Sequence, residues 1–281
     1  MIEIVIVALC ISLSCALLGS FLVVQGESLM SDAMSHSLLS GILIAYLVSG
    51  KMSFFFLAFG GLISSVIAIF MVYWLSEKAL IKQDVSIGVV FSYFFSIGVV
   101  LISLYASRIH LDIDMVLLGD LVFVPFNRLY WNGFDIGSFN VFIAIIVCCI
   151  NIAVIWLFHR SLVLVAFDKK YGQIAGVNLK LITAFGVLLT SLNLVIAFEC
   201  VGIVASIGML VVPPATALLR ADSIQEVIFK SVIVALLGTL IGIKIAFGAD
   251  ISIAGSLVMA EIFLFTIVFF LTRKRKIIKN N

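Results

Sequence analysis

Residues 4–24 read IVIVALCISLSCALLGSFLVV, an apolar run without a charged residue. About 20 such residues in a helix cross the hydrocarbon core of a bilayer, so the run predicts a membrane-spanning helix. No basic segment precedes it and no small-residue cleavage site follows its apolar part, which favours a retained span over a signal peptide. The first segment therefore indicates a membrane protein, and similar runs follow it along the chain.

Composition supports the same class for the whole chain. Of 281 residues, 64% are hydrophobic and 11% are charged, and the mean hydropathy is +1.32. A soluble core cannot hide so much apolar surface. The net charge of +2 is too small for the basic footprint of a nucleic-acid-binding protein. We expect an all-α polytopic membrane protein with eight or nine transmembrane helices, forming a single integral domain over residues 1–281. Nine runs qualify as spans: 4–24, 30–49, 53–75, 86–107, 139–159, 181–198, 200–219, 229–247 and 254–271.

Lys and Arg collect in segments that are expected to face the cytoplasm. These segments are the connections 76–85, 160–180 and 220–230 and the basic tail 272–281. The connection 108–138 and the region near Asp250 lean acidic and are expected outside. Counting spans back from the tail places the N-terminus outside as well. Within the outer connection, the amphipathic run Leu111–Phe126 is expected to lie on the membrane surface as a short helix.

An acid and an imidazole stand four residues apart at the head of the second span. Residues 26–37 read GESLMSDAMSHS, and they contain Asp32 and His36. On a helix these two positions share a face, with Cβ atoms roughly 5–6 Å apart, so the side chains can hold one ion between them. A carboxylate is costly in hydrocarbon, so this face should look into a water-filled path or a protein interior. Alternatively, Asp32 caps the helix and His36 donates to a backbone carbonyl.

Other polar features are less specific. Glu199 stands between two predicted spans near the outer surface, where it either attracts cations or is a solvated turn residue. Pro213 and Pro214 lie inside a predicted span and should break its helix. The cysteines lie in apolar segments without metal-binding spacing, as expected of small buried side chains: Cys10, Cys15, Cys148, Cys149 and Cys200. The chain carries neither a GxSxG nor an HExxH motif, so no enzyme activity is expected.

The cytoplasmic segment 167–177 reads FDKKYGQIAGV. It can form a short helix that is capped by Asp168 and ends near Gly176. A solvated turn is the simpler interpretation. A docking helix for a cytoplasmic partner is the more specific one.

Together these segments resemble the integral permeases of ABC importers for manganese, zinc and iron. The resemblance covers nearly the whole chain and rests on six motifs in the family's order: 19–24 (GSFLVV), 28–36 (SLMSDAMSH), 82–92 (KQDVSIGVVFS), 117–120 (LLGD), the loop at Phe167 and Asp168, and 198–202 (FECVG) leading to 211–217 (VVPPATA). Residues 123–129 (FVPFNRL) and 250–255 (DISIAG) look most like the manganese- or iron-handling branch. The chain departs from the family's usual basic residue at Gln25, glycine at Ser31 and proline at Ser40.

The resemblance implies a permease subunit of an ATP-driven importer in the bacterial inner membrane. Two permease subunits would form the path, an extracytoplasmic binding protein would deliver the metal, and two separate cytoplasmic ATPases would hydrolyse ATP. Asp32 and His36 of both subunits would converge on transported Mn²⁺, Fe²⁺ or Zn²⁺, with no permanently bound cofactor. The segment 167–177 would be the helix that couples the permease to an ATPase, with contacts from Phe167, Asp168, Tyr171, Ala175 and Gly176.

Two other functions fit the composition. A permease for a metal chelate, such as a siderophore or cobalamin, would need a wide apolar cavity and would gain nothing from an intramembrane Asp–His pair. A secondary carrier driven by an ion gradient would be expected to show inverted repeats and broken paired helices. Neither repeats nor such helices are visible in the sequence.

Overall fold

The computed structural model describes all of the chain except residues 51–52, 106–120, 132–133, 168–173, 175–177 and 281. Eight helices in the described part are long and apolar enough to cross a membrane. These helices are α1 (Ile2–Val24), α2 (Met30–Ser49), α3 (Phe54–Ala79), α4 (Gln83–Tyr105), α6 (Phe139–Phe167), α8 (Leu179–Leu218), α9 (Ile224–Ala249) and α10 (Ile253–Asn280). The predicted all-α class with eight or nine transmembrane helices is therefore confirmed.

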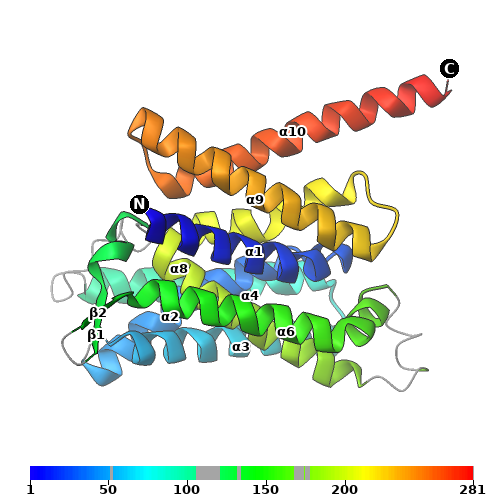
Figure 1. The fold of residues 1–281 in the computed structure, drawn as a ribbon. Helices are drawn as coiled ribbons and strands as arrows, with labels where there is room; N and C mark the ends of the chain where they lie inside the picture. Colours follow the sequence, from blue (N-terminus) through cyan, green and yellow to red (C-terminus); the bar gives the residue numbers. More distant parts are fainter. Residues whose placement is uncertain (51–52, 106–120, 132–133, 168–173, 175–177, 281) are drawn as a thin grey trace.

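Helix α8 contains a reversal of the chain at Gly202. This residue has φ 81° and ψ 172°, a conformation that only glycine adopts readily. Asn193, before it, donates to Cys15 of α1, whereas Leu210, after it, lies against Gly19 one turn further along α1. In a continuous helix Asn193 and Leu210 would be about 25 Å apart, while one helical turn is about 5.4 Å. The two parts of α8 therefore run in opposite directions, as Figure 1 also shows.

This reversal agrees with the separate spans predicted at 181–198 and 200–219. The expected break at the prolines is wrong, because α8 stays helical through Pro213 and Pro214. A proline lacks the N–H that would bond to the carbonyl four residues before it. Pro214 thereby frees the carbonyl of Leu210, and this oxygen lies against Gly19 of α1. Close packing between two helices replaces the lost hydrogen bond with weaker contacts.

The termini lie at opposite ends of the helix bundle (Figure 1). The end of α6 and the α8–α9 connection lie toward the end that holds the C-terminus, and the α9–α10 connection with Asp250 lies toward the other. The basic connections around 160–180 and 220–230 thus share an end with the basic tail. Which end faces the cytoplasm stays a prediction.

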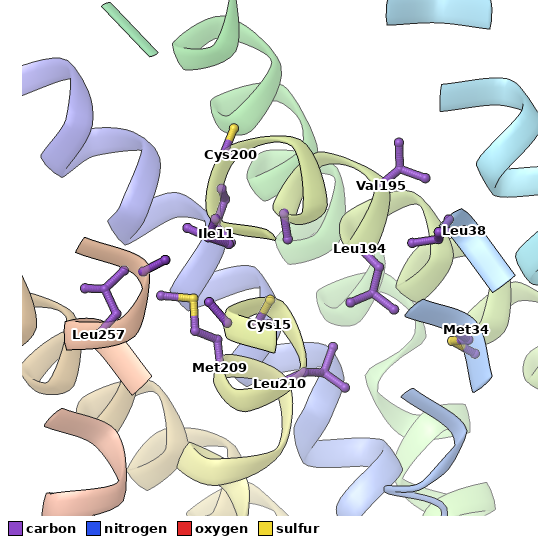
Figure 2. Close-up of a cluster of buried hydrophobic side chains, with 14 of the residues drawn as sticks. Ile11, Cys15, Met34, Leu38, Leu194, Val195, Cys200, Met209, Leu210 and Leu257 are labelled. Atoms are coloured by element: carbon purple, nitrogen blue, oxygen red, sulfur yellow. The ribbon is translucent and has the colours of Figure 1, made fainter. Parts of the chain in front are cut away.

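The core lies where α8 passes between α1, α2 and α10. Figure 2 shows Met209 and Leu210 of α8 beside Cys15 of α1, with Leu257 of α10 on one side. On the other side, Leu194 of α8 faces α2. Buried polar contacts also join the helices, because hydrocarbon leaves polar side chains no water partner. The hydroxyls of Ser65 (α3) and Ser191 (α8) are 2.8 Å apart, and Asn151 (α6) donates to Asn193 at 3.2 Å.

A small folded connection stands between α4 and α6. It comprises a 3-10 helix, η1 (Leu121–Phe126), and an antiparallel hairpin of β1 (Arg128–Trp131) and β2 (Phe134–Ser138). The hairpin was not predicted. The expected surface helix over Leu111–Phe126 is corrected for its last part, since Leu121 and Val124 are buried against the bundle. Residues 111–120 lie outside the described residues.

Candidate functional site

The site is built on the first turns of α2. Asp32 and His36 are only partly buried, whereas Met30, Ala33 and Met34 around them are fully buried. Leu29, just before the helix, is 48% exposed. The spacing 29, 32, 36 follows one face of a helix, so the Asp–His pair lies on the accessible edge of α2.

Hydrogen bonding does not supply the structural roles considered for this pair. The N-terminus of α2 has no side-chain cap, so Asp32 does not act as one. The Nδ1 atom of His36 is buried without a hydrogen-bond partner among the described residues. A buried nitrogen without a partner is costly and therefore calls for a water molecule, a ligand or a group from another chain.

Two aromatic rings of α4 hold the His36 imidazole. Its ring centroid lies 4.6 Å from Phe91 and 5.1 Å from Phe95, with interplanar angles of 87° and 89°. Phe91 and Phe95 stack on each other one turn apart. Edge-to-face packing of this kind restricts rotation of the imidazole. Sequence reasoning did not assign this role, although the four-residue spacing of the two phenylalanines was visible.

Glu27 fixes the start of α2. Its side chain is buried, and the hydroxyl of Tyr73 on α3 donates to Glu27 Oε2 at 3.2 Å. Gly26 before it has φ 73°, which allows the sharp turn between α1 and α2. The turn and this hydrogen bond set the register of α2 against α3, and hence the position of Asp32. The sequence analysis assigned no role to Glu27 or Tyr73.

The serines of α2 face inward. Ser31 donates to the carbonyl of Ser28, and Ser37 donates to the carbonyl of Met34. Ser31 and Ser35 are fully buried. The side chains on the accessible edge that offer ligand atoms are therefore the carboxylate and the imidazole.

Glu199 lies near the reversal of α8, three residues before Gly202, and its side chain is exposed. Its neighbour Phe198 packs with Ile203 against Leu39 and Leu43 of α2. Within the described residues, no three His, Cys, Asp or Glu side chains gather closely enough to hold a metal ion. Glu199 does not complete the Asp32–His36 pair within one chain.

The predicted coupling segment is described only in part. Phe167 is the last residue of α6. Asp168, Tyr171, Ala175 and Gly176 lie outside the described residues. The α8 helix that follows begins with a cap, in which the side chain of Asn178 accepts from the backbone N–H of Leu181.

Solved structures show the same fold. The chain superimposes on a chain of PsaBC from Streptococcus pneumoniae in complex with Fab with a TM-score of 0.81. The match covers 99% of this chain and 93% of that one, at 24% sequence identity. At this identity the comparison concerns the fold.

Sequence comparisons identify the family. The family model described as the ABC 3 transport family matches residues 1–272. The chain is 33% identical to the manganese transport system membrane protein MntD of Bacillus subtilis, over 88% of this chain and 83% of that protein. It is 32% identical to the zinc transport system membrane protein TroD of Treponema pallidum, over 99% of this chain and 75% of that protein. The chain therefore belongs to the ABC 3 transport family and is a multi-pass, non-catalytic membrane permease subunit of an ABC transporter.

Proposed function

We propose that this permease carries divalent metal ions across the bacterial cytoplasmic membrane, with Mn²⁺ or Fe²⁺ as the main cargo and Zn²⁺ as a further one. The observation that carries the proposal is the accessible Asp32–His36 pair with its unpartnered Nδ1 atom. Carboxylate oxygen and imidazole nitrogen suit these three ions. The names of the relatives, which transport manganese or zinc, support the same class of cargo.

A second permease subunit, identical or paralogous, completes the site in this proposal. One chain offers two ligands, and a two-fold axis beside the accessible edge of α2 would bring two carboxylates and two imidazoles together. Phe95, which packs on His36, is itself exposed on α4 and is available to contact the second subunit. Glu199 would attract cations into the outer part of the path.

The other proposed partners are an extracytoplasmic metal-binding protein and two cytoplasmic ATPase subunits. In this arrangement the whole chain, 1–281, acts as one integral domain. The loop 160–180 and the basic tail 272–281 face the ATPases. The permease itself holds no resident cofactor, because the metal is its cargo.

A metal-competition assay tests the proposed cargo. A strain that lacks its own metal permease is complemented with this chain and its cognate ATPase and binding protein. We expect uptake of radioactive Mn²⁺ that unlabelled Fe²⁺ and Zn²⁺ reduce, since all three fit the same ligands. Uptake of a siderophore complex or cobalamin without uptake of free metal would instead establish a chelate permease. Uptake that persists without the ATPase would establish a secondary carrier.

The coupling role of the segment 167–177 is tested separately. Replacing Ala175 and Gly176 by bulky charged residues is expected to prevent co-purification of the ATPase, or to abolish hydrolysis that depends on transport. Large charged side chains cannot enter a groove shaped for small ones. The control is Ser223→Ala, which removes a helix cap in the connection 220–230, also expected in the cytoplasm, and costs about 1 kcal/mol of helix stability. Normal ATPase association in the Ala175 and Gly176 variants would show that the segment is a simple turn.

A further inference from the structure

A carboxyl group far from the Asp–His pair is completely buried in the bundle. Glu261 of α10 is 0% exposed, and neither of its oxygens has a hydrogen-bond partner among the described residues. The transport site proposed above makes no use of it. A buried polar group of this kind calls for an explanation.

Glu261 lies in a tight contact between two helices, which we term the α9–α10 seam and define by Gly238, Gly242, Leu257 and Glu261. A Cβ atom on Gly238 would lie 2.6 Å from the Cγ atom of Glu261. A Cβ atom on Gly242 would lie 2.6 Å from the Cα atom of Leu257. Two glycines one turn apart thus allow α10 to approach α9 closely and press Glu261 against it.

Among the described residues, the surroundings of Glu261 contain polar atoms but no counter-charge. Thr239 follows Gly238 on α9, and its buried hydroxyl has no partner among the described residues either. The Cys15 thiol of α1 is close enough to interact with the carboxyl group electrostatically. Helix α9 carries Glu226 and Lys230, which pair with each other near its first turn.

The other described charged groups of the helices packed against α10 are exposed. Lys244 of α9 and Glu199 of α8 are exposed side chains. Cys200 of α8 is buried next to Glu199, just before the reversal at Gly202. The η1 segment contains no titratable residue. An ionised Glu261 would therefore be an uncompensated charge in the membrane interior, which is unfavourable.

Binding one proton neutralises the Glu261 carboxylate and requires no other side chain. A divalent metal would need further charged ligands, and the described residues provide no three-ligand group here. We propose that Glu261 is a proton-binding site: it holds a proton while the α9–α10 seam is closed and releases it when the seam opens and water enters. The neutral carboxyl group then carries one hydrogen-bond donor in place of the second charged acceptor oxygen.

The direction of the pH effect follows from this assignment. Because the closed seam holds the proton and the open seam releases it, the closed seam is favoured at low pH and loses that advantage as pH rises. Alkaline conditions thus favour opening between α9 and α10. This inference stands independently of the metal that the permease transports.

Infrared spectroscopy of the purified permease tests the assignment directly. At neutral pH the wild type should show the carbonyl absorption of a protonated carboxyl group, and the band should be absent from Glu261→Gln. The matched control is Glu226→Gln, which changes a half-exposed, ion-paired glutamate on α9 and should leave the band unchanged. Identical spectra of the wild type and Glu261→Gln would overturn the proposal.

Thermal unfolding provides a second measurement that does not depend on assigning a band. Between about pH 6 and about pH 9 the unfolding midpoint of the wild type should fall more steeply than that of Glu261→Gln. Glu261→Leu is the second variant, in case the amide is not tolerated, and it should lose the same part of the pH dependence. A parallel decline in the wild type and in whichever variant folds would contradict a proton on Glu261.

Discussion

Replacing Asp32 or His36 by alanine is expected to abolish metal uptake while leaving the protein in the membrane. Each change removes one of the two ligands that the chain offers, and a two-fold site would lose both copies. Mutating a residue that only orients a metal ligand typically lowers metal affinity or activity about 10–100-fold. For a ligand itself we therefore expect metal uptake to fall by at least about 100-fold. Uptake of radioactive Mn²⁺ in complemented cells, normalised to permease in the membrane fraction, measures the effect.

The control for this experiment lies on the same edge as the pair, at the residue just before α2. Leu29→Ala removes an exposed apolar side chain one turn before Asp32 and should leave uptake near the wild-type level. Wild-type uptake in both Asp32→Ala and His36→Ala would remove the pair from the transport path. Loss of uptake in Leu29→Ala as well would assign the whole edge to packing against another subunit.

Gly19→Ala is expected to destabilise the fold severely. The added Cβ atom would lie 1.8 Å from the carbonyl oxygen of Leu210 and 2.8 Å from its carbonyl carbon. Both atoms belong to the backbone, so α1 and α8 must move apart. Overpacking in a core typically costs about 1–3 kcal/mol, and a clash with backbone belongs at or above the upper end of that range. The yield of monodisperse protein and the thermal unfolding midpoint report the effect.

Gly186→Ala is the matched control for this variant. Gly186 also lies in a helix, in the first part of α8, but a Cβ atom there would meet nothing within 4 Å. Alanine favours a helix over glycine by about 1 kcal/mol, so this variant should be as stable as the wild type or more stable. If both variants behaved like the wild type, the close approach of α1 to α8 at Gly19 would be disproved.

The spans could be predicted because the hydrocarbon core of a membrane offers no hydrogen-bond partners to the backbone. A long apolar run can cross it only as a helix, in which the backbone groups bond to one another. The nine predicted runs correspond to the helices observed, including the two parts of α8 on either side of Gly202. The break was expected at Pro213 or Pro214 as well, since a proline inside a helix removes a hydrogen bond. Packing against Gly19 compensates for that loss, and no local rule reveals such a contact between distant residues.

The surroundings of the site could be predicted less well. The spacing of Asp32 and His36 placed them on one helical face, but contacts between helices decide what surrounds them. In a helix that is apolar on all sides, the pattern does not show which side faces a neighbour. The rings of Phe91 and Phe95 and the bond from Tyr73 to Glu27 were therefore missed. The β1–β2 hairpin was missed because its strands are short and carry charged residues.

The serine at position 40 changes the mechanics of the helix that carries the site. A proline at this position would set a permanent bend. Here Ser40 donates to the carbonyl of Ser37 at 2.9 Å and lies 3.3 Å from the Ser64 hydroxyl of α3. Hydroxyls that bond to the preceding turn weaken a helix slightly and let it flex. We therefore expect α2 to flex more easily one turn beyond His36 than a helix that a proline bends permanently.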